Sequence, residues 1–262
     1  SSVDSRCTDP GETSCVDWEA GIAIATGMGA PASFATSEAQ RNITAQRAAK
    51  LDAARNLLEL MKGVNLSSST TTRGAMVESD TINASIQGRL MGLRPVGEPR
   101  YFSDGSVQVK LEARLREVIP PELFASQAGA PQPIPGPFGS GAGSRLSADR
   151  VYTGLIVDAR GTDVTPAMSP KIYDPEQREV YGSAYVSREF AVTQGMAGYV
   201  KSVERAQETD RVKGNPAMVK ALKASGANNA DLVVSQEDAD TLRKIARTQN
   251  FLSEGRVMIV LD

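Results

Sequence analysis

The residues best placed to do chemistry form a glycine turn near the N-terminus. The stretch GIAIATGMGAP, residues 21–31, resembles a strand that runs into a turn, and with Ala32 it gives the spacing G-x-G-x-x-A from Gly27. A dinucleotide site needs a helix that begins within the glycines and an acidic residue after the next strand. Here the segment ASFATS precedes a helix expected near Ser37, and the next expected strand carries no acid. We therefore predict a strand end and its connection, not a nucleotide loop.

Two acidic residues provide a second candidate site. Asp158 and Asp163 flank Gly161 at the end of an apolar strand, a position where α/β sheets often place ligands. Two carboxylates could hold a hard cation. More often such acids only terminate a strand, so we expect neither a metal nor a cofactor.

The composition limits the chemistry further. The chain of 262 residues contains no histidine, which excludes serine–histidine triads and histidine-bound zinc. Its 29 basic and 31 acidic residues give a net charge of −2, which does not indicate a nucleic-acid surface. With motifs this weak, we predict a protein that is not an enzyme and does not bind nucleic acid.

The two cysteines indicate in which kind of cell compartment the protein resides. Cys7 and Cys15 lie in a polar N-terminal segment, whereas free cysteines usually occupy apolar surroundings. We expect a disulfide-closed loop over residues 1–15, with two unpaired thiols as the alternative. A disulfide would indicate an oxidising compartment. No apolar run approaches the roughly 20 residues of a membrane span, and no leader is present, so the signal of an exported protein would already have been removed.

An N-terminal α+β domain is predicted over residues 16–118. A long helix over 37–62 would pack on a mainly antiparallel sheet. Asp104-Gly105 indicates a hairpin leading into the alternating strand 107–115. The Ser/Thr run that follows the long helix is expected to be extended. The apolar side of the helix is formed by Ile43, Ala54, Leu57, Leu58 and Met61.

A Pro/Gly-rich linker over 119–149 would precede a small α/β domain over 150–262. In that domain Asn215-Pro216 indicates the start of a helix that ends at Gly226, and Ser235 indicates the cap of another. A strand follows each of them. This order of helix, strand, helix and strand predicts a parallel pair.

The N-terminal half resembles the LPP20 lipoprotein family over residues 18–118. That family includes the flagellar outer-membrane protein P, and the N-terminal domain of flagellar protein T is similar to it. Trp18 shortly precedes a strand that ends in Ala-Thr-Gly, and an alanine-rich helix and Gly63-Val64 follow. The remaining matching positions are Ala45, Ala48, Ala49, Asp52, Ala53, Arg55, Leu57, Glu59, Gly88, Gly92, Asp104 and Gly105.

The resemblance implies a non-enzymatic envelope protein of a Gram-negative bacterium. It would lie in the periplasm, at the outer membrane or at the cell surface, and could form a ring around the flagellar motor. The first residue is not a lipid-bearing cysteine, so membrane association would be peripheral at most. The expected partners are further copies of the chain and other envelope or flagellar proteins.

Three function classes follow from these observations. The first is an oligomeric structural protein whose contacts use free strand edges at 66–72 and 107–115. The second is a soluble periplasmic module whose C-terminal domain binds a ligand or cation near Asp158 and Asp163. The third is an enzyme that uses carboxylates or serines in an unrecognised arrangement. The candidate subunit contacts are Leu66, Ser68, Thr70, Thr72, Val107, Val109 and Leu111.

Overall fold

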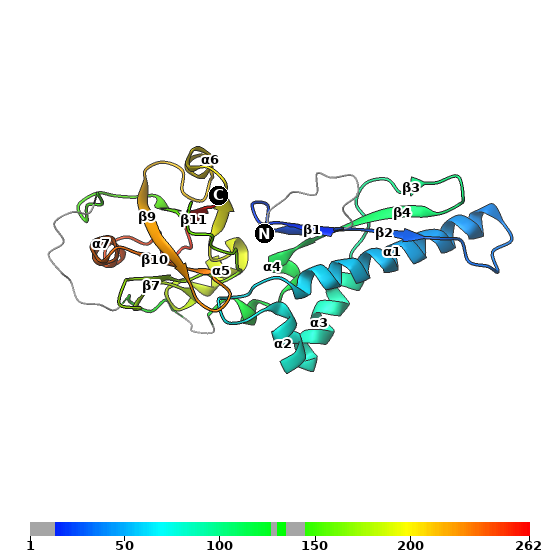
Figure 1. Cartoon of the computed structure of the whole chain (residues 1–262), viewed down its shortest axis with the longest axis horizontal. Coiled ribbons are helices and arrows are strands. Elements are labelled where there is room, and N and C mark those ends of the chain that lie inside the picture. Colours follow the sequence, from blue (N-terminus) through cyan, green and yellow to red (C-terminus); the bar gives the residue numbers. More distant parts are fainter. Residues whose placement is uncertain (1–13, 127–129, 135–144) are drawn as a thin grey trace. The chain divides into compact units, whose positions relative to one another are not determined.

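The computed structural model describes residues 14–126, 130–134 and 145–262 (Figure 1). The chain divides into two compact units. Unit 1 consists of residues 1–64 and 72–120, and unit 2 of residues 65–71 and 121–262. The predicted fold class, a helix on an antiparallel sheet followed by an α/β region, is confirmed. No helix in the described residues is long and apolar enough to cross a membrane.

Unit 1 is built on a four-stranded antiparallel sheet in the order β1-β2-β4-β3. Its central strand β4 alternates buried and exposed residues, as its sequence predicts. The Asp104-Gly105 turn joins β3 to β4, and the Asp104 carboxylate accepts the Ser106 N–H at 2.9 Å. The strands are β1 (Ser14–Asp17), β2 (Ile22–Gly29), β3 (Arg100–Tyr101) and β4 (Val107–Arg114).

The long helix α1 (Glu38–Lys62) packs along β2. Ser37 caps its N-terminus by accepting the Gln40 N–H, and Gly63 ends it, as predicted. Three shorter helices complete the unit: α2 (Thr72–Glu78), α3 (Asp80–Met91) and α4 (Leu115–Val118).

The glycine turn is the place where helix and sheet backbones meet. A Cβ atom on Gly27 would lie 2.1 Å from the Ala53 nitrogen, and one on Gly29 would lie 2.2 Å from the Ala45 oxygen. The facing ridge of α1 consists of alanines at every fourth position, and Ala45, Ala49 and Ala53 are fully buried. Glycine in a strand often marks such a close backbone approach. The G-x-G spacing therefore serves packing, in agreement with the prediction that it is not a nucleotide loop.

The predicted apolar side of α1 is partly wrong. Ile43 is 51% exposed, because the alanine ridge rather than the larger side chains faces the sheet at this end of the helix. Farther along the helix, Leu57 and Met61 are buried as predicted.

Unit 2 contains a seven-stranded mixed sheet in the order β7-β6-β10-β9-β5-β11-β8. The apolar strands β5 and β11 pair in parallel, and both are almost fully buried. The strands are β5 (Gly154–Asp158), β6 (Ile172–Tyr173), β7 (Glu179–Tyr181), β8 (Gly198–Val200), β9 (Pro216–Ser225), β10 (Asp231–Val234) and β11 (Val257–Val260).

The helix predicted after Asn215 is wrong, because residues 216–225 form the strand β9. Ala217, Val219 and Ala221 are buried while Met218, Lys220 and Leu222 alternate with them on the exposed side. β9 pairs in parallel with β5 and antiparallel with β10, so sheet hydrogen bonds override the helical preference of Ala, Leu and Lys. The helices are α5 (Arg188–Gln194), α6 (Val203–Glu208) and α7 (Gln236–Ala246), with short 3₁₀ turns η1 (Pro121–Leu123) and η2 (Ser183–Tyr185).

A buried ion cluster joins α7 to the β6–β7 hairpin. The guanidinium of Arg243 lies 2.8 Å from the Asp174 carboxylate and 3.3 Å from that of Asp240. Arg243 and Asp174 are both 0% exposed. The second Asp174 oxygen accepts the N–H groups of Glu176 and Arg178, which holds the hairpin turn.

Where the structure describes it, the predicted linker segment is packed. Ile119 and Phe124 are buried, as is Leu146 at its far end. The Gln132 N–H donates to the Ala184 carbonyl at 2.9 Å. Residues 127–129 and 135–144 lie outside the described part of the chain.

Candidate functional site

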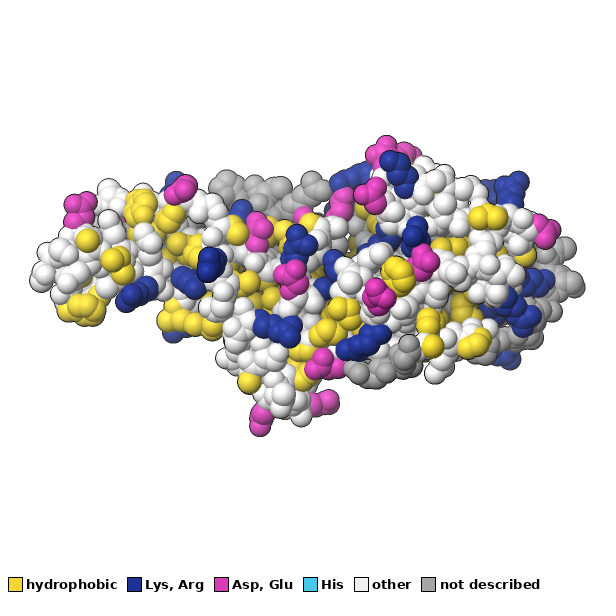
Figure 2. All heavy atoms as spheres, turned by 180° about the vertical axis from the view of Figure 1, so that it is seen from behind, with side chains coloured by type: hydrophobic (Ala, Val, Ile, Leu, Met, Phe, Trp, Pro, Cys, Tyr) yellow, Lys and Arg dark blue, Asp and Glu magenta, His cyan; other side chains and the backbone are white. Residues whose placement is uncertain are grey.

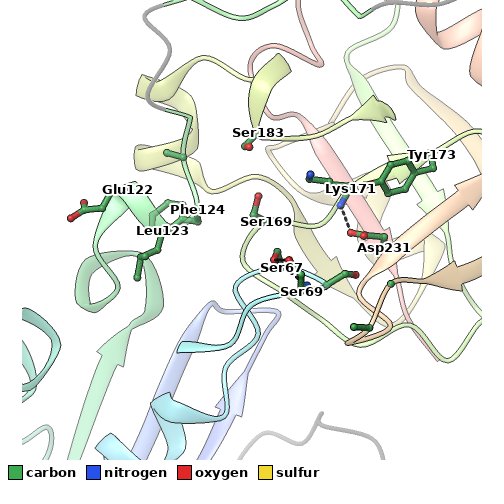
Figure 3. Close-up of a pocket in the computed structure, with 14 residues that line it drawn as sticks. Ser67, Ser69, Glu122, Leu123, Phe124, Ser169, Lys171, Tyr173, Ser183 and Asp231 are labelled. Carbon is green, nitrogen blue, oxygen red and sulfur yellow. Dashed lines mark hydrogen bonds between the residues drawn. The ribbon is translucent and has the colours of Figure 1, made fainter. Parts of the chain in front are cut away.

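Unit 2 contains a polar cavity of about 370 Å³ (Figure 3). Five of its lining residues are serines, contributed by the 67–69 segment, by the approach to β6 and by η2. Lys171 and Asp231 provide charge, and Phe124 forms part of one wall. The lining residues are Ser67, Ser68, Ser69, Glu122, Leu123, Phe124, Ala125, Ser169, Lys171, Tyr173, Ser183, Gly226, Ala227 and Asp231.

The serine segment is anchored in unit 2 by backbone and side-chain hydrogen bonds. The Ser68 hydroxyl donates to the Ser225 carbonyl at 3.1 Å and accepts the Ala230 N–H at 3.0 Å. Ser68 fits only because residue 226 is glycine, since a Cβ there would lie 2.3 Å from the Ser68 hydroxyl oxygen. Gly226 also has a φ of +90°, which other residues rarely adopt. These contacts fix one wall of the cavity.

Lys171 is held as a cation. Its ammonium lies 3.0 Å from the Glu179 carboxylate. Burial alone would lower the pKa of Lys171, but the hydrogen bond and charge of Glu179 outweigh it, so the pKa is raised. A general base needs a pKa near the working pH, and a protonated lysine cannot accept the proton of a serine. Lys171 and its neighbouring serines therefore do not form a nucleophile–base pair.

Asp231 is a buried carboxylate in the lining of the cavity. It is 5% exposed, and one of its oxygens accepts the backbone N–H of Lys171 at 2.9 Å. Burial raises the pKa of Asp231, and the backbone hydrogen bond and the charge of Lys171 offset that effect only in part. The charged form is thus disfavoured by folding.

Two serine hydroxyls retain unused hydrogen-bonding capacity. The hydroxyls of Ser169 and Ser183 make no hydrogen bond to any part of the chain that the structure describes. Figure 3 shows these two side chains grouped with the ammonium end of Lys171. They offer both donors and acceptors to an incoming molecule.

This site yields a stability prediction at Asp231. A carboxyl group whose pKa is raised by folding destabilises the fold as the pH rises from its unfolded value of 3.8 through the folded value. Asp231→Asn keeps the oxygen that accepts the Lys171 N–H and removes the buried charge. We expect it to raise the urea midpoint of unit 2 at pH 7, and the gain to shrink as the pH approaches 3.8. An unchanged or lower midpoint at pH 7 would contradict this expectation.

Asp158 and Asp163 lie at and just after the end of β5, as predicted, and they do not line the serine cavity. Asp158 ends β5, where Arg160 lies 2.9 Å and Lys220 3.6 Å from its carboxylate. Asp163 adopts a positive φ of 56°, and its carbonyl accepts the Asn229 amide. The ion pairs of Asp158 use the charge that a cation would need. Among the described residues, no group of three or more acidic or cysteine side chains could hold a metal ion.

The prediction that residues 66–72 and 107–115 form exposed contact strands is wrong. Residues 66–71 form a loop rather than a strand, closed by one bridge between Asn65 and Thr71, and Thr72 begins α2. Leu66, Ser68 and Thr72 are buried, and Thr70 is exposed in that loop. The side chains of Val107, Val109 and Leu111 are buried too, since β4 is an inner strand whose apolar face lies in the core.

Of the two cysteines, Cys15 lies buried in β1 and is disulfide-bonded. Cys7 lies outside the described residues.

The sequence reasoning missed the serine cavity altogether. Its members are scattered from residue 67 to residue 231, and only the Ser/Thr run was visible as a local signal. Threonine favours extended structure, so this run predicts a strand, whereas residues 66–71 form a loop.

Unit 2 is a mixed α/β module with a polar cavity. Residues 154–262, from β5 to the C-terminus, are similar to the family described as the second domain of Treponema pallidum Tp0624. The match covers less than half of the chain. No curated protein matches the chain.

Proposed function

We propose that this chain is a non-enzymatic, exported cell-envelope protein that assembles through protein–protein contacts. Unit 1 carries the resemblance to the LPP20 family over residues 18–118, which implies export and outer-membrane association. The likeness of residues 154–262 to the second domain of Treponema pallidum Tp0624 is compatible with a modular chain. A ring at the flagellar motor is one form that such an assembly could take.

The observation that carries the assembly proposal is a small group of exposed apolar side chains on and before α1, called the apolar row below. Ile43 is 51% and Leu51 39% exposed; they lie about two helical turns apart, and the exposed Arg47 lies between them. Phe34, which precedes the same helix, is 75% exposed. Figure 2 shows hydrophobic side chains reaching the surface among charged ones. Exposed apolar side chains on and beside one helix can contribute to a contact with another subunit.

Light scattering with negative-stain imaging tests this proposal. The purified chain is expected to form large regular particles at micromolar concentration. Ile43→Lys with Leu51→Lys places two charges on the row and should weaken association about tenfold or more. Met91→Lys is the matched control, because Met91 is 51% exposed on α3 and lies outside the row. A strict monomer at all concentrations, or equal effects of both variants, would contradict the proposal.

The cavity of unit 2 favours a second candidate function, a module that captures a small ligand. Glu179 holds Lys171 as a cation and two of the lining hydroxyls are unused, so the cavity is equipped for recognition rather than catalysis. Ligand capture and assembly are compatible in one chain, because the apolar row lies in unit 1. A specific thermal shift of unit 2 with a small molecule would support this candidate.

A further inference from the structure

We infer that the serine cavity of unit 2 binds a neutral, hydroxyl-rich molecule of the size of a mono- or disaccharide. This inference rests on the second candidate function, ligand capture by unit 2. It comes from the charge balance of the described lining, from its unused hydrogen-bonding groups and from its volume.

The charged side chains of the lining disfavour an anionic ligand and give a cationic ligand no net advantage. The only lining ammonium belongs to Lys171, and Glu179 neutralises it at 3.0 Å. The two lining carboxylates, Asp231 and Glu122, would repel a carboxylate or phosphate. The Asp231 carboxylate would attract an organic cation, but the ammonium of Lys171 in the same lining would repel it. One oxygen of Asp231 is also already occupied, since it accepts the Lys171 backbone N–H at 2.9 Å. A neutral ligand meets neither penalty.

The hydrogen-bonding groups match a polyol. A sugar hydroxyl both donates and accepts, and so do the free hydroxyls of Ser169 and Ser183. The Asp231 carboxylate is 5% exposed and can accept from a ligand hydroxyl. A hydrogen bond to a charged acceptor is stronger than one between neutral groups. An apolar ligand would leave these groups desolvated and unpaired, which is unfavourable.

The dimensions set the size of the ligand. A volume of about 370 Å³ lies near the lower end of the roughly 300–1,000 Å³ of small-molecule pockets. Leu123, Phe124 and Ala125 supply an apolar wall against which the carbon face of a sugar ring could pack. The cavity therefore suits one or two rings rather than a long chain.

Saturation-transfer NMR with the full chain tests the ligand class. The probes are glucose, N-acetylglucosamine and maltose as neutral sugars, phosphate and acetate as anions, and putrescine as a cation. We expect at least one sugar to bind and the charged probes not to bind. The double variant Ser169→Ala and Ser183→Ala should weaken sugar binding roughly tenfold or more. Ser187→Ala is the matched control, since Ser187 lies outside the lining and its side chain makes no capping hydrogen bond.

Asp231→Asn separates loss of the site from loss of the fold. This variant is expected to be more stable than the parent at pH 7 and yet to bind the sugar more weakly, so unfolding cannot explain the loss. Sugar binding that the double variant Ser169→Ala and Ser183→Ala leaves unchanged would overturn the inference. Binding of charged probes alone would overturn the ligand class and leave ligand capture in place. No binding by any probe at 10 mM, on the order of the weakest affinities considered, would count against ligand capture itself.

Discussion

Replacing Gly27 with alanine is expected to destabilise unit 1 by about 3 kcal/mol or more. The new Cβ atom would lie 2.1 Å from the Ala53 nitrogen and 2.3 Å from the Ala49 oxygen. These are backbone atoms of a 25-residue helix, so no side chain can rotate away and α1 itself must move. Overpacking of this kind usually costs about 1–3 kcal/mol, and a rigid neighbour places it at the high end.

Urea unfolding followed by the fluorescence of Trp18 provides the measurement. Trp18 is the only tryptophan of the chain and lies buried in unit 1, so its signal reports that unit. Gly88→Ala is the control, because Gly88 lies inside α3 and nothing would meet a Cβ there within 4 Å. That change should stabilise by about 0.5–1 kcal/mol. The two substitutions of glycine by alanine are thus expected to change the free energy of unfolding in opposite directions. A change in the same direction for both would contradict the packing explanation.

The second large effect is expected at Arg243. Arg243→Met leaves the carboxylates of Asp174 and Asp240 buried without their cation, and should destabilise unit 2 by about 3–5 kcal/mol. The control is Arg178→Met, which breaks only an exposed pair with Glu176 at 3.2 Å. An exposed pair is worth about 1 kcal/mol or less. Far-UV circular dichroism in urea would show the transition of unit 2, which Trp18 does not report.

The Arg243 variant also has an expected pH signature. Burial alone would raise the pKa of Asp174, but the Arg178 N–H and the Arg243 guanidinium outweigh it, and the pKa is lowered below 3.8. A carboxyl group with a lowered pKa contributes stability that is present above its unfolded value and lost as the pH falls through the folded value. The difference between the parent chain and Arg243→Met should therefore shrink below pH 3.8. A difference that stays constant down to pH 2, on the order of the lowest carboxyl pKa values, would contradict this role.

Local signals in the sequence determined the elements that depend on near neighbours. Ser37 and Gly63 define the ends of α1, Ser235 caps α7 by accepting the Asp238 N–H, and Asp104-Gly105 turns the hairpin. These signals act through hydrogen bonds over two to four residues. For that reason the α+β and α/β classes could be predicted from the sequence.

Elements that depend on distant partners were predicted wrongly. Residues 216–225 have the composition of a helix, but they lie between β5 and β10, whose pairing makes them a strand. Ile43 was assigned to the core because it is large and apolar, yet the alanine ridge faces the sheet. A stripe of alanines four residues apart, opposite a G-x-G strand, was a usable signal for this packing.

The sequence by itself determined that the chain offers no histidine for chemistry and where the main helices are capped, and it predicted that Gly27 and Gly29 lie at the end of a strand. Only the tertiary structure decided what those glycines pack against and where the polar cavity lies. Ser68, Lys171 and Asp231 are far apart along the chain, and all three line the same cavity. Residue types and short spacings indicate local hydrogen bonds. A cavity depends on which distant segments pack together, and local patterns in the sequence do not reveal that packing.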